Sequence, residues 1–322
     1  MKVLLASDQF WPMVSGVATA GRNLASGLAA AGHEVLVIAP SQTGHPYEET
    51  DRNYHITRTR SVPVPARENL RISVAFQNEI KRIIEEFGPD IVHVHTQLTV
   101  GLTTIRMARK LGLPIVATNH AMPQNIIDNL KFLVPVAKPV SYILMEYGPL
   151  LYKGADHIIM PTQGAIDIFK PDAFSGAPIT AVSNGIDLSS SSPGPVPKSL
   201  YRHYHLPTNE PIVTYLGRLD AEKHLEVVVR ALAVLRQRGE AVHGLFVGTG
   251  NTEDKLQNLA SELGIAKHVT FTGRVSDEDR TLLHRVGTLY VMPSPVELQS
   301  LSTLEAMASG QPIIAVRNGV LL

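Results

Sequence analysis

Short apolar runs alternate with longer amphipathic stretches along most of this 322-residue chain. Runs that are apolar on both faces are typical of parallel strands covered by helices, and helices with one apolar face are typical of the connections between such strands. In the first half the predicted strands are Val3–Ser7, Glu34–Ala39, Asp90–His95, Leu113–Thr118, His157–Pro161 and Ile179–Ser183, and the predicted helices are Thr19–Ala31, Leu70–Phe87 and Thr99–Leu111. The first half is therefore predicted to be a doubly wound α/β sheet.

The same pattern returns in the second half after a break. Ser189–Pro197 is rich in serine and proline, and we expect it neither to pack nor to form a regular element. Beyond it, the predicted strands are Ile212–Leu216, His243–Val247, Val269–Thr272, Thr288–Met292 and Pro312–Val316, separated by predicted helices Leu225–Arg238, Thr252–Leu263, Asp277–Val286 and Leu301–Ser309. The pattern predicts domains over 1–183 and 208–322, joined by a linker over 184–207 and facing each other across a cleft. Since little sequence follows Val316, we expect the second domain to be incomplete at its C-terminal end.

Composition excludes several kinds of protein. Lysine plus arginine equals aspartate plus glutamate at 29 each, which argues against nucleic-acid binding through bulk charge. The absence of cysteine excludes disulfide scaffolds and thiolate zinc sites. No apolar run is long enough to span a membrane, and the first run is too short for a secretory signal. We expect a soluble, cytoplasmic protein, at most in contact with the cytoplasmic face of a membrane.

The strongest chemical signal lies between Glu297 and Glu305. Seven residues separate the two carboxylates, the first in a loop after a strand and the second inside the next helix. The backbone N–H groups of Leu298, Gln299, Ser300 and Leu301 crowd the start of that helix, and a helix N-terminus is a favourable site for a diphosphate. Carboxylates beside it can accept hydrogen bonds from sugar and ribose hydroxyls. The alternative is a capped helix with a solvated glutamate.

A second signal, Gly217-Arg-Leu-Asp-Ala-Glu-Lys223, follows the first strand of the second half. Arg218 offers a bidentate fork and Lys223 a point charge, so together they can bind a diphosphate and stabilise the charge that develops when it leaves. The alternative is a solvated turn before a helix.

These two stretches resemble the nucleotide-sugar glycosyltransferases of family 4, and the resemblance covers nearly the whole chain. Supporting motifs are Pro12–Val17, Thr118–Pro123, Ser183–Asp187, Val247–Gly250 and Phe271–Val275. The resemblance implies the GT-B fold of two Rossmann-like domains and a retaining hexosyltransferase that needs neither metal nor cofactor. His224 stands where the family usually has glycine after the Glu-Lys pair.

The resemblance also implies roles for single residues. Glu297 would hold the donor sugar and Glu305 the ribose, while Arg218 and Lys223 would bind the diphosphate. The backbone of Arg274 and Val275 would meet the base. Gly16 would let its loop approach the phosphates and the anomeric carbon, and His120 would lie near the sugar, so that Arg218, Lys223, Glu297 and His120 form the expected catalytic set.

Other features are open to more than one interpretation. His93 and His95 share one face of a strand, and we interpret them as structural histidines or histidines at the edge of the cleft rather than as a metal pair. Asp277–Asp279 resembles a metal-binding motif but is better placed to cap a helix. The apolar stretch Asn129–Lys153, with its scattered lysines, is equally consistent with a membrane-contacting face and with an ordinary core helix.

The expected reaction is transfer of a hexose from a UDP-glucose or GDP-mannose type of donor to an acceptor. Thr118–Pro123 and Glu297–Ser300 look most like family members that glycosylate diacylglycerol or phosphatidylinositol, which favours a membrane lipid as acceptor. The alternatives are a soluble acceptor, a nucleotide-sugar epimerase and a non-catalytic nucleotide-sugar-binding module.

Overall fold

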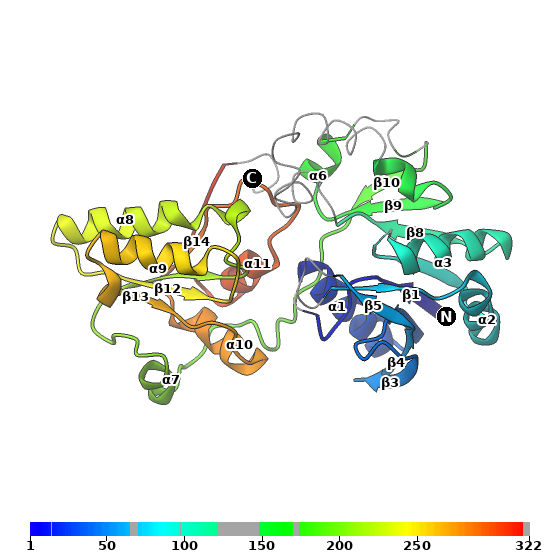
Figure 1. Cartoon of the computed structure of the whole chain (residues 1–322), viewed down its shortest axis with the longest axis horizontal. Coiled ribbons are helices and arrows are strands. Elements are labelled where there is room, and N and C mark those ends of the chain that lie inside the picture. The colour runs from blue at the N-terminus through cyan, green and yellow to red at the C-terminus, as the bar shows by residue number, and fades with distance from the viewer. Residues whose placement is uncertain are drawn as a thin grey trace. The chain divides into compact units, whose positions relative to one another are not determined.

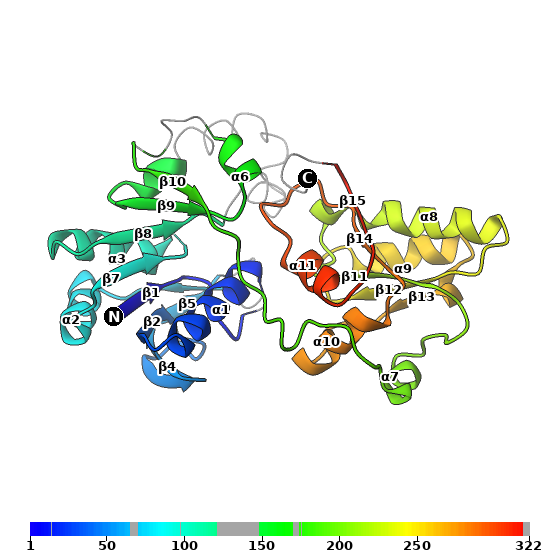
Figure 2. The same cartoon turned by 180° about the vertical axis from the view of Figure 1, so that it is seen from behind.

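The computed structural model describes residues 1–13, 15–64, 70–96, 98–120, 148–169, 174 and 176–317. They form two compact units, Met1–Gly185 and Ile186–Leu322, here named the N-terminal and the C-terminal unit. Each unit is built on its own sheet, parallel except for one strand pair of the N-terminal unit, and both sheets can be followed in Figure 1 and from behind in Figure 2.

The described part of the N-terminal unit contains an eight-stranded sheet in the order β10-β9-β8-β7-β1-β2-β4-β3. All neighbouring strands are parallel except β3 and β4. The strands are β1 (Lys2–Ala6), β2 (Glu34–Pro40), β3 (Tyr47–Asp51), β4 (Tyr54–Thr59), β7 (Ile91–Val94), β8 (Ile115–Thr118), β9 (His157–Met160) and β10 (Ile179–Ala181), with β5 (Ser61–Pro63) and β6 (Arg71–Ser73) as a separate ribbon. The helices are α1 (Gly16–Ala30), α2 (Gln77–Phe87), α3 (Thr99–Lys110), the 3₁₀ turn η2 (Gly148–Tyr152) and α6 (Gln163–Asp167).

The continuous apolar runs of β1 and β2 fill both faces of this sheet. Val3 and Val37 pack in one cluster with Phe10 and with Leu24 of α1. Leu4, on the opposite face, is also fully buried. Alternate residues of a strand point to opposite faces, so such burial on both sides requires helices on both sides, as the sequence predicts.

The region from Tyr47 to Ser73 departs from the prediction. The predicted helix over Leu70–Phe87 is wrong in its first turns, because Arg71–Ser73 is strand β6 and pairs antiparallel with β5. The helix α2 begins only at Gln77. Strands β3 and β4 at the edge of the sheet are polar or mixed in sequence and carry no apolar run that could reveal them.

The described part of the C-terminal unit contains a five-stranded parallel sheet in the order β13-β12-β11-β14-β15. Its strands are β11 (Ile212–Leu216), β12 (His243–Val247), β13 (Val269–Phe271), β14 (Leu289–Met292) and β15 (Ile313–Ala315). Its helices are α7 (Lys198–His203), α8 (Leu225–Gln237), α9 (Glu253–Glu262), α10 (Asp277–Val286) and α11 (Leu301–Ala308), with 3₁₀ turns η3 (Ala221–Lys223) and η4 (Ala266–His268). Most of these bounds lie within one residue of the prediction.

The predicted linker is partly structured. Lys198–His203 forms α7, and Leu200 packs into the core of the C-terminal unit. Arg285 of α10 donates hydrogen bonds to the carbonyls of Ser190 and Ser192, at 3.0 and 2.7 Å. The expectation that Ser189–Pro197 does not pack is therefore wrong, because a long cationic side chain satisfies its backbone carbonyls. Within the described residues, no helix combines the length and apolarity that crossing a bilayer requires.

Candidate active site

Each sheet reverses its strand order next to its first strand. In the C-terminal unit the chain runs from β11 through β12 to β13 and then returns to the other side of β11 as β14. The loops that follow β11 and β14 therefore leave the same edge of the sheet from adjacent strands. Ligands of open α/β sheets bind at such a reversal. These two loops hold the segments Gly217–Lys223 and Pro293–Ser300.

Glycines of the neighbouring loop fix the path of the loop after β11. The N–H of Leu219 donates to the carbonyl of Thr249 at 2.9 Å. A Cβ on Gly248 would lie 2.1 Å from the carbonyl oxygen of Gly217, and one on Gly250 would lie 2.3 Å from the backbone of Leu219. Both contacts are too short for any side chain. The glycines of the Val247–Gly250 motif therefore let two loops pack backbone to backbone.

The cations of this loop are paired with carboxylates. Lys223 donates from Nζ to Oε1 of Glu297 at 2.5 Å, which links the loops after β11 and β14. Arg218 donates from Nη2 to Oε1 of Glu222 at 2.6 Å and from Nη1 to Asp220. The Lys223 and Glu297 side chains are only 13% and 12% exposed, whereas that of Arg218 is 38% exposed. Arg218 is thus the more accessible cation for an arriving anion.

The loop after β14 ends in helix α11. Ser300 caps this helix, because its Oγ accepts from the N–H of Thr303 at 3.2 Å. The hydroxyl of Tyr290 reaches from β14 to Ser302 and fixes the first turn. Helix α11 begins four residues after Glu297 in the chain, so the partial positive charge of its N-terminus follows closely on this carboxylate.

The second carboxylate of the motif, Glu305, has different partners. Arg280 of α10 donates from Nη1 to its two oxygens at 2.7 and 2.6 Å, and His284 Nε2 lies 3.2 Å from Oε2. Burial acts to raise the pKa of the Glu305 carboxyl, but the hydrogen bond with His284 and the charge of Arg280 outweigh burial and hold that pKa below its ordinary value. Glu305 therefore stays ionised inside the unit.

In the N-terminal unit the strand order reverses between β1 and β7. Here the N-terminus of α3 is capped by Asp8, which follows β1 and is far from α3 in the sequence. Its Oδ1 accepts from the N–H groups of Thr99 and Val100 at 2.9 and 2.7 Å and from the Thr99 hydroxyl at 2.7 Å. Its Oδ2 accepts from the N–H groups of Leu98 and Gly101 and from the Thr96 hydroxyl. The chain's own carboxylate thus occupies the anion site that a helix N-terminus offers.

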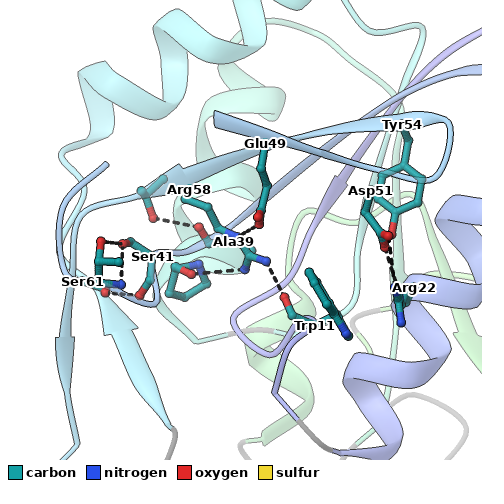
Figure 3. A network of polar contacts seen from close by, with 12 residues as sticks. Trp11, Arg22, Ala39, Ser41, Glu49, Asp51, Tyr54, Arg58 and Ser61 are labelled. Carbon is teal, nitrogen blue, oxygen red and sulfur yellow. Dashed lines mark hydrogen bonds and ion pairs between the residues drawn. The ribbon is translucent and has the colours of Figure 1, made fainter. Parts of the chain in front are cut away.

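Trp11, in the segment that follows β1, is held by two arginines (Figure 3). Arg58 of β4, whose side chain is fully buried, donates to the carbonyl of Trp11 and to Oε1 of Glu49, the latter at 2.7 Å. Arg22 of α1 lies over the Trp11 ring, with 4.6 Å between its Cζ and the ring centroid. Arg22 is itself held by Asp51, which Tyr54 also contacts. The two arginines therefore fix Trp11 by its backbone and by its ring.

Gly16 is the first residue of α1. Ser15 before it caps this helix, since its Oγ accepts from the N–H of Ala18 at 3.1 Å. Apart from the chain neighbours and the backbone of α1 itself, no atom of the described residues lies within 4 Å of the position that a Cβ on Gly16 would take. The packing of these residues therefore does not require glycine at this position.

Three histidines form a column at the carboxyl ends of β7 and β8. The rings of His93 and His95 stack with centroids 4.6 Å apart, and those of His95 and His120 stack at 5.2 Å. His95 Nδ1 lies 2.9 Å from His120 Nε2, and His93 Nε2 lies 2.7 Å from the Thr118 hydroxyl. Burial lowers the pKa of His93 to about 4 and that of His120 to about 3, and it holds the pKa of His95 well below its ordinary value. All three rings are neutral at pH 7.

Comparison with known proteins shows to which family the chain belongs. Residues 14–190 match the model described as Glycosyltransferase Family 4, which is more than half of the chain, and residues 200–322 match Glycosyl transferases group 1. The chain belongs to glycosyltransferase family 4. It is accordingly a glycosyltransferase, as the resemblance in the sequence implies.

Individual proteins that are similar to this chain carry names consistent with this family. The alpha-monoglucosyldiacylglycerol synthase of Streptococcus pneumoniae is 26% identical over 99% of this chain and 71% of its own. The GDP-mannose-dependent alpha-mannosyltransferase of Mycolicibacterium smegmatis is 28% identical over 98% of this chain and 79% of its own. The structure of a sucrose-phosphate synthase from Thermosynechococcus elongatus superposes with a TM-score of 0.74 at 20% identity, covering 99% of this chain and 82% of that one. The predicted GT-B fold is confirmed.

In this family 4 glycosyltransferase the structure brings Lys223 and Glu297 into direct contact and leaves Glu305 with partners of its own. Arg274 is exposed just before α10, and Val275 packs against the core of the C-terminal unit. Leu298 is buried, and Ser300 caps α11. Gly16 and His120 belong to the N-terminal unit.

The sequence does not single out Arg280 and His284, which both contact the predicted Glu305. Arg280 and His284 are spaced four apart on α10, so one helix face presents both to Glu305. The sequence singles out His95 and contains Asp220 in the 217–223 motif, but it does not predict their contacts with His120 and Arg218. The helical spacing of Arg280 and His284 was available as a signal, but only the tertiary structure shows what that face meets.

Ser276 caps α10 by accepting from the N–H of Asp279, so Asp277–Asp279 is a helix start as predicted. Among the residues that the structure describes, no three histidine, aspartate or glutamate side chains are grouped so as to hold a metal. Ala121–Pro123 and the greater part of the Asn129–Lys153 stretch lie outside the described residues, so its two interpretations both stand.

Proposed function

We propose that this chain transfers a hexosyl group from a nucleotide-diphosphate sugar to a membrane lipid, with retention of the anomeric configuration. The observation that carries the proposal is the Lys223–Glu297 contact at the strand-order reversal of the C-terminal unit, with Arg218 on the same loop and α11 starting a few residues after Glu297. A diphosphate and the sugar attached to it need these two kinds of group, cation and carboxylate, side by side.

The donor would be held through three kinds of contact. Arg218, Lys223 and the N-terminus of α11 bind the diphosphate, and Glu297 accepts hydrogen bonds from the sugar hydroxyls. Glu305, kept ionised by Arg280, accepts from the ribose, and the backbone of Arg274 and Val275 meets the base. Gly16 and His120 of the N-terminal unit contact the phosphates and the sugar.

The chemistry would consist of stabilising the leaving group. Negative charge grows on the β-phosphate as the glycosidic bond breaks, and the fixed cations stabilise this charge. An oxygen of the departing phosphate takes the proton of the acceptor hydroxyl on the same face of the sugar, so the configuration is retained. No side chain is needed as a nucleophile, and neither metal nor cofactor takes part.

The lipid acceptor is supported by the relative named for a glucosylated diacylglycerol. The donor class is supported by the relative that depends on GDP-mannose. A lipid acceptor requires that the protein meets a membrane surface, and contact of the N-terminal unit with that surface is part of the proposal.

The test measures nucleoside diphosphate release from UDP and GDP sugars, with and without vesicles that contain diacylglycerol or phosphatidylinositol. A thermal-shift screen of UDP, GDP and ADP sugars first selects the donor, because a ligand that binds the folded state raises the melting temperature. We expect release that needs lipid, resists chelator and yields a product with the donor's anomeric configuration. Release without any acceptor, turnover of a soluble acceptor alone, or an inverted product would contradict the proposal.

A further inference from the structure

The histidine column contains one nitrogen that the proposed chemistry leaves unexplained. His95 is 4% exposed, and its Nε2 is buried with no hydrogen-bond partner among the residues described. Its other ring nitrogen, Nδ1, is the one that meets His120 Nε2 at 2.9 Å. His95 and His120 are therefore two neutral imidazoles joined by one hydrogen bond.

A neutral imidazole carries a proton on one of its two ring nitrogens. Only two arrangements of the two rings therefore keep the hydrogen bond between them. In the first, His95 Nδ1–H donates to His120 Nε2, which leaves His95 Nε2 as an unprotonated acceptor and puts the proton of His120 on Nδ1. In the second, His120 Nε2–H donates to His95 Nδ1, which puts a proton on the buried His95 Nε2 and leaves His120 Nδ1 bare. The two arrangements make His120 a donor or an acceptor toward whatever its Nδ1 meets.

The buried Nε2 favours the first arrangement. A buried N–H without an acceptor is among the rarest defects in folded proteins, whereas a buried acceptor that lacks a donor is tolerated more often. Charging either ring to avoid the choice is unfavourable, because burial lowers the pKa of both His95 and His120. The ring planes are held by the stacking of His93, His95 and His120, and Tyr152 fixes the residue before His120 by donating to Oδ1 of Asn119 at 2.8 Å.

We propose that His95 is a positioning residue that keeps His120 in the neutral tautomer protonated on Nδ1, so that His120 offers an N–H to an oxygen of the donor sugar or its diphosphate. His120 is then a hydrogen-bond donor and not a general base. The identity of the ligand oxygen rests on the proposed function, whereas the tautomer rests only on the described residues.

The tautomer is tested first, without substrate. A long-range proton–nitrogen NMR spectrum of the full chain labelled in histidine shows which ring nitrogen carries the proton, and the His120 signals are assigned by their loss in His120→Gln. We expect His120 protonated on Nδ1 and His95 also on Nδ1. Protonation of His120 on Nε2 would overturn the proposal.

Three variants of His95 then test its effect on turnover. His95→Asn keeps an N–H donor where Nδ1 stands, and we expect kcat within about threefold of the parent. His95→Leu removes the donor, and His95→Asp offers only an acceptor, which draws the His120 proton to Nε2. For both we expect kcat to fall about 10- to 100-fold, part of the cost of losing one transition-state hydrogen bond, with little change in KM.

The matched control is His157→Asn. His157 of β9 lies outside the column, with its Nε2 2.8 Å from the Thr180 hydroxyl, and its replacement should leave kcat within about threefold. Equal activity of His95→Asp and His95→Asn would contradict the proposal. A parent protein that turns over no nucleotide sugar would contradict the proposed function, while the NMR spectrum would still decide the tautomer.

Discussion

The two sheets reverse their strand order in the same way but use the reversal differently. In the N-terminal unit, the helix that starts there is capped by Asp8, a carboxylate of the chain itself. In the C-terminal unit, the carboxylate at the reversal, Glu297, meets Lys223, and the helix is capped by the neutral hydroxyl of Ser300. The comparison teaches that a shared topology provides two potential anion sites, and that a carboxylate of the chain itself already occupies the one in the N-terminal unit.

The largest effect expected from this difference is on catalysis. Lys223→Ala removes a cation at the reversal of the C-terminal unit, and we expect kcat/KM for nucleoside diphosphate release to fall about 10²- to 10³-fold. The control is Lys255→Ala, an exposed lysine of α9, which should stay within about twofold. Near-normal turnover by a folded Lys223→Ala, with hydrogen exchange in α8 unchanged, would contradict a role of this reversal in catalysis.

The equivalent change in the N-terminal unit should affect stability instead. Asp8→Asn replaces one carboxylate oxygen by an amide NH₂. Each carboxylate oxygen accepts from three donors, so the NH₂ faces three donors whichever way the amide is oriented. We expect the change to cost about 2–4 kcal/mol of unfolding free energy. Trp11, the chain's single tryptophan, lies in this unit, so its fluorescence during urea unfolding measures the loss. Unchanged unfolding would show that the cap contributes little.

Acid should distinguish the units as well. The folded pKa of His93, about 4, lies below its ordinary value of 6.5, so the unfolded chain takes up the proton first as the pH falls. The contribution of His93 is therefore present above pH 6.5 and is lost as the pH falls through about 4, at no more than about 1.4 kcal/mol per pH unit. In His93→Asn the unfolding free energy, measured by Trp11 fluorescence, should therefore change less steeply with pH in this range. Identical slopes would contradict the assigned neutral state.

The smallest effect concerns Glu305. At pH 7 Arg280→Met should cost the C-terminal unit about 1 kcal/mol, a modest loss because the arginine is 39% exposed and solvent screens the pair. The folded pKa of Glu305 is lowered, so this contribution is present above the ordinary carboxyl pKa and disappears as acid protonates the folded state. Hydrogen exchange of α11 at pH 7 and pH 3 measures the difference, and Glu305→Gln should show no pH dependence of this kind.

The sequence predicted most of the fold because its signals are local. Apolar runs such as Ile212–Leu216 and His243–Val247 reproduce their strands residue for residue. The polar edge strand Tyr47–Asp51 has no such run, and its existence depends on pairing with β4, so it could not be found. For the candidate site, the charged residues and their motifs were recognisable. Their partners were not, because Arg280 and His95 reach their contacts across different elements.

The close approach of the loops at Gly248 and Gly250 has a consequence for mutational searches. These residues bear no charge and would escape a survey of ionisable side chains. Yet one added methyl group at either position would collide with backbone and push aside the segment on which Arg218 stands. The path of the segment that carries Arg218 thus depends on the absence of side chains in the neighbouring loop. Gly250→Ala should therefore disturb anion affinity while leaving every charge in the protein in place.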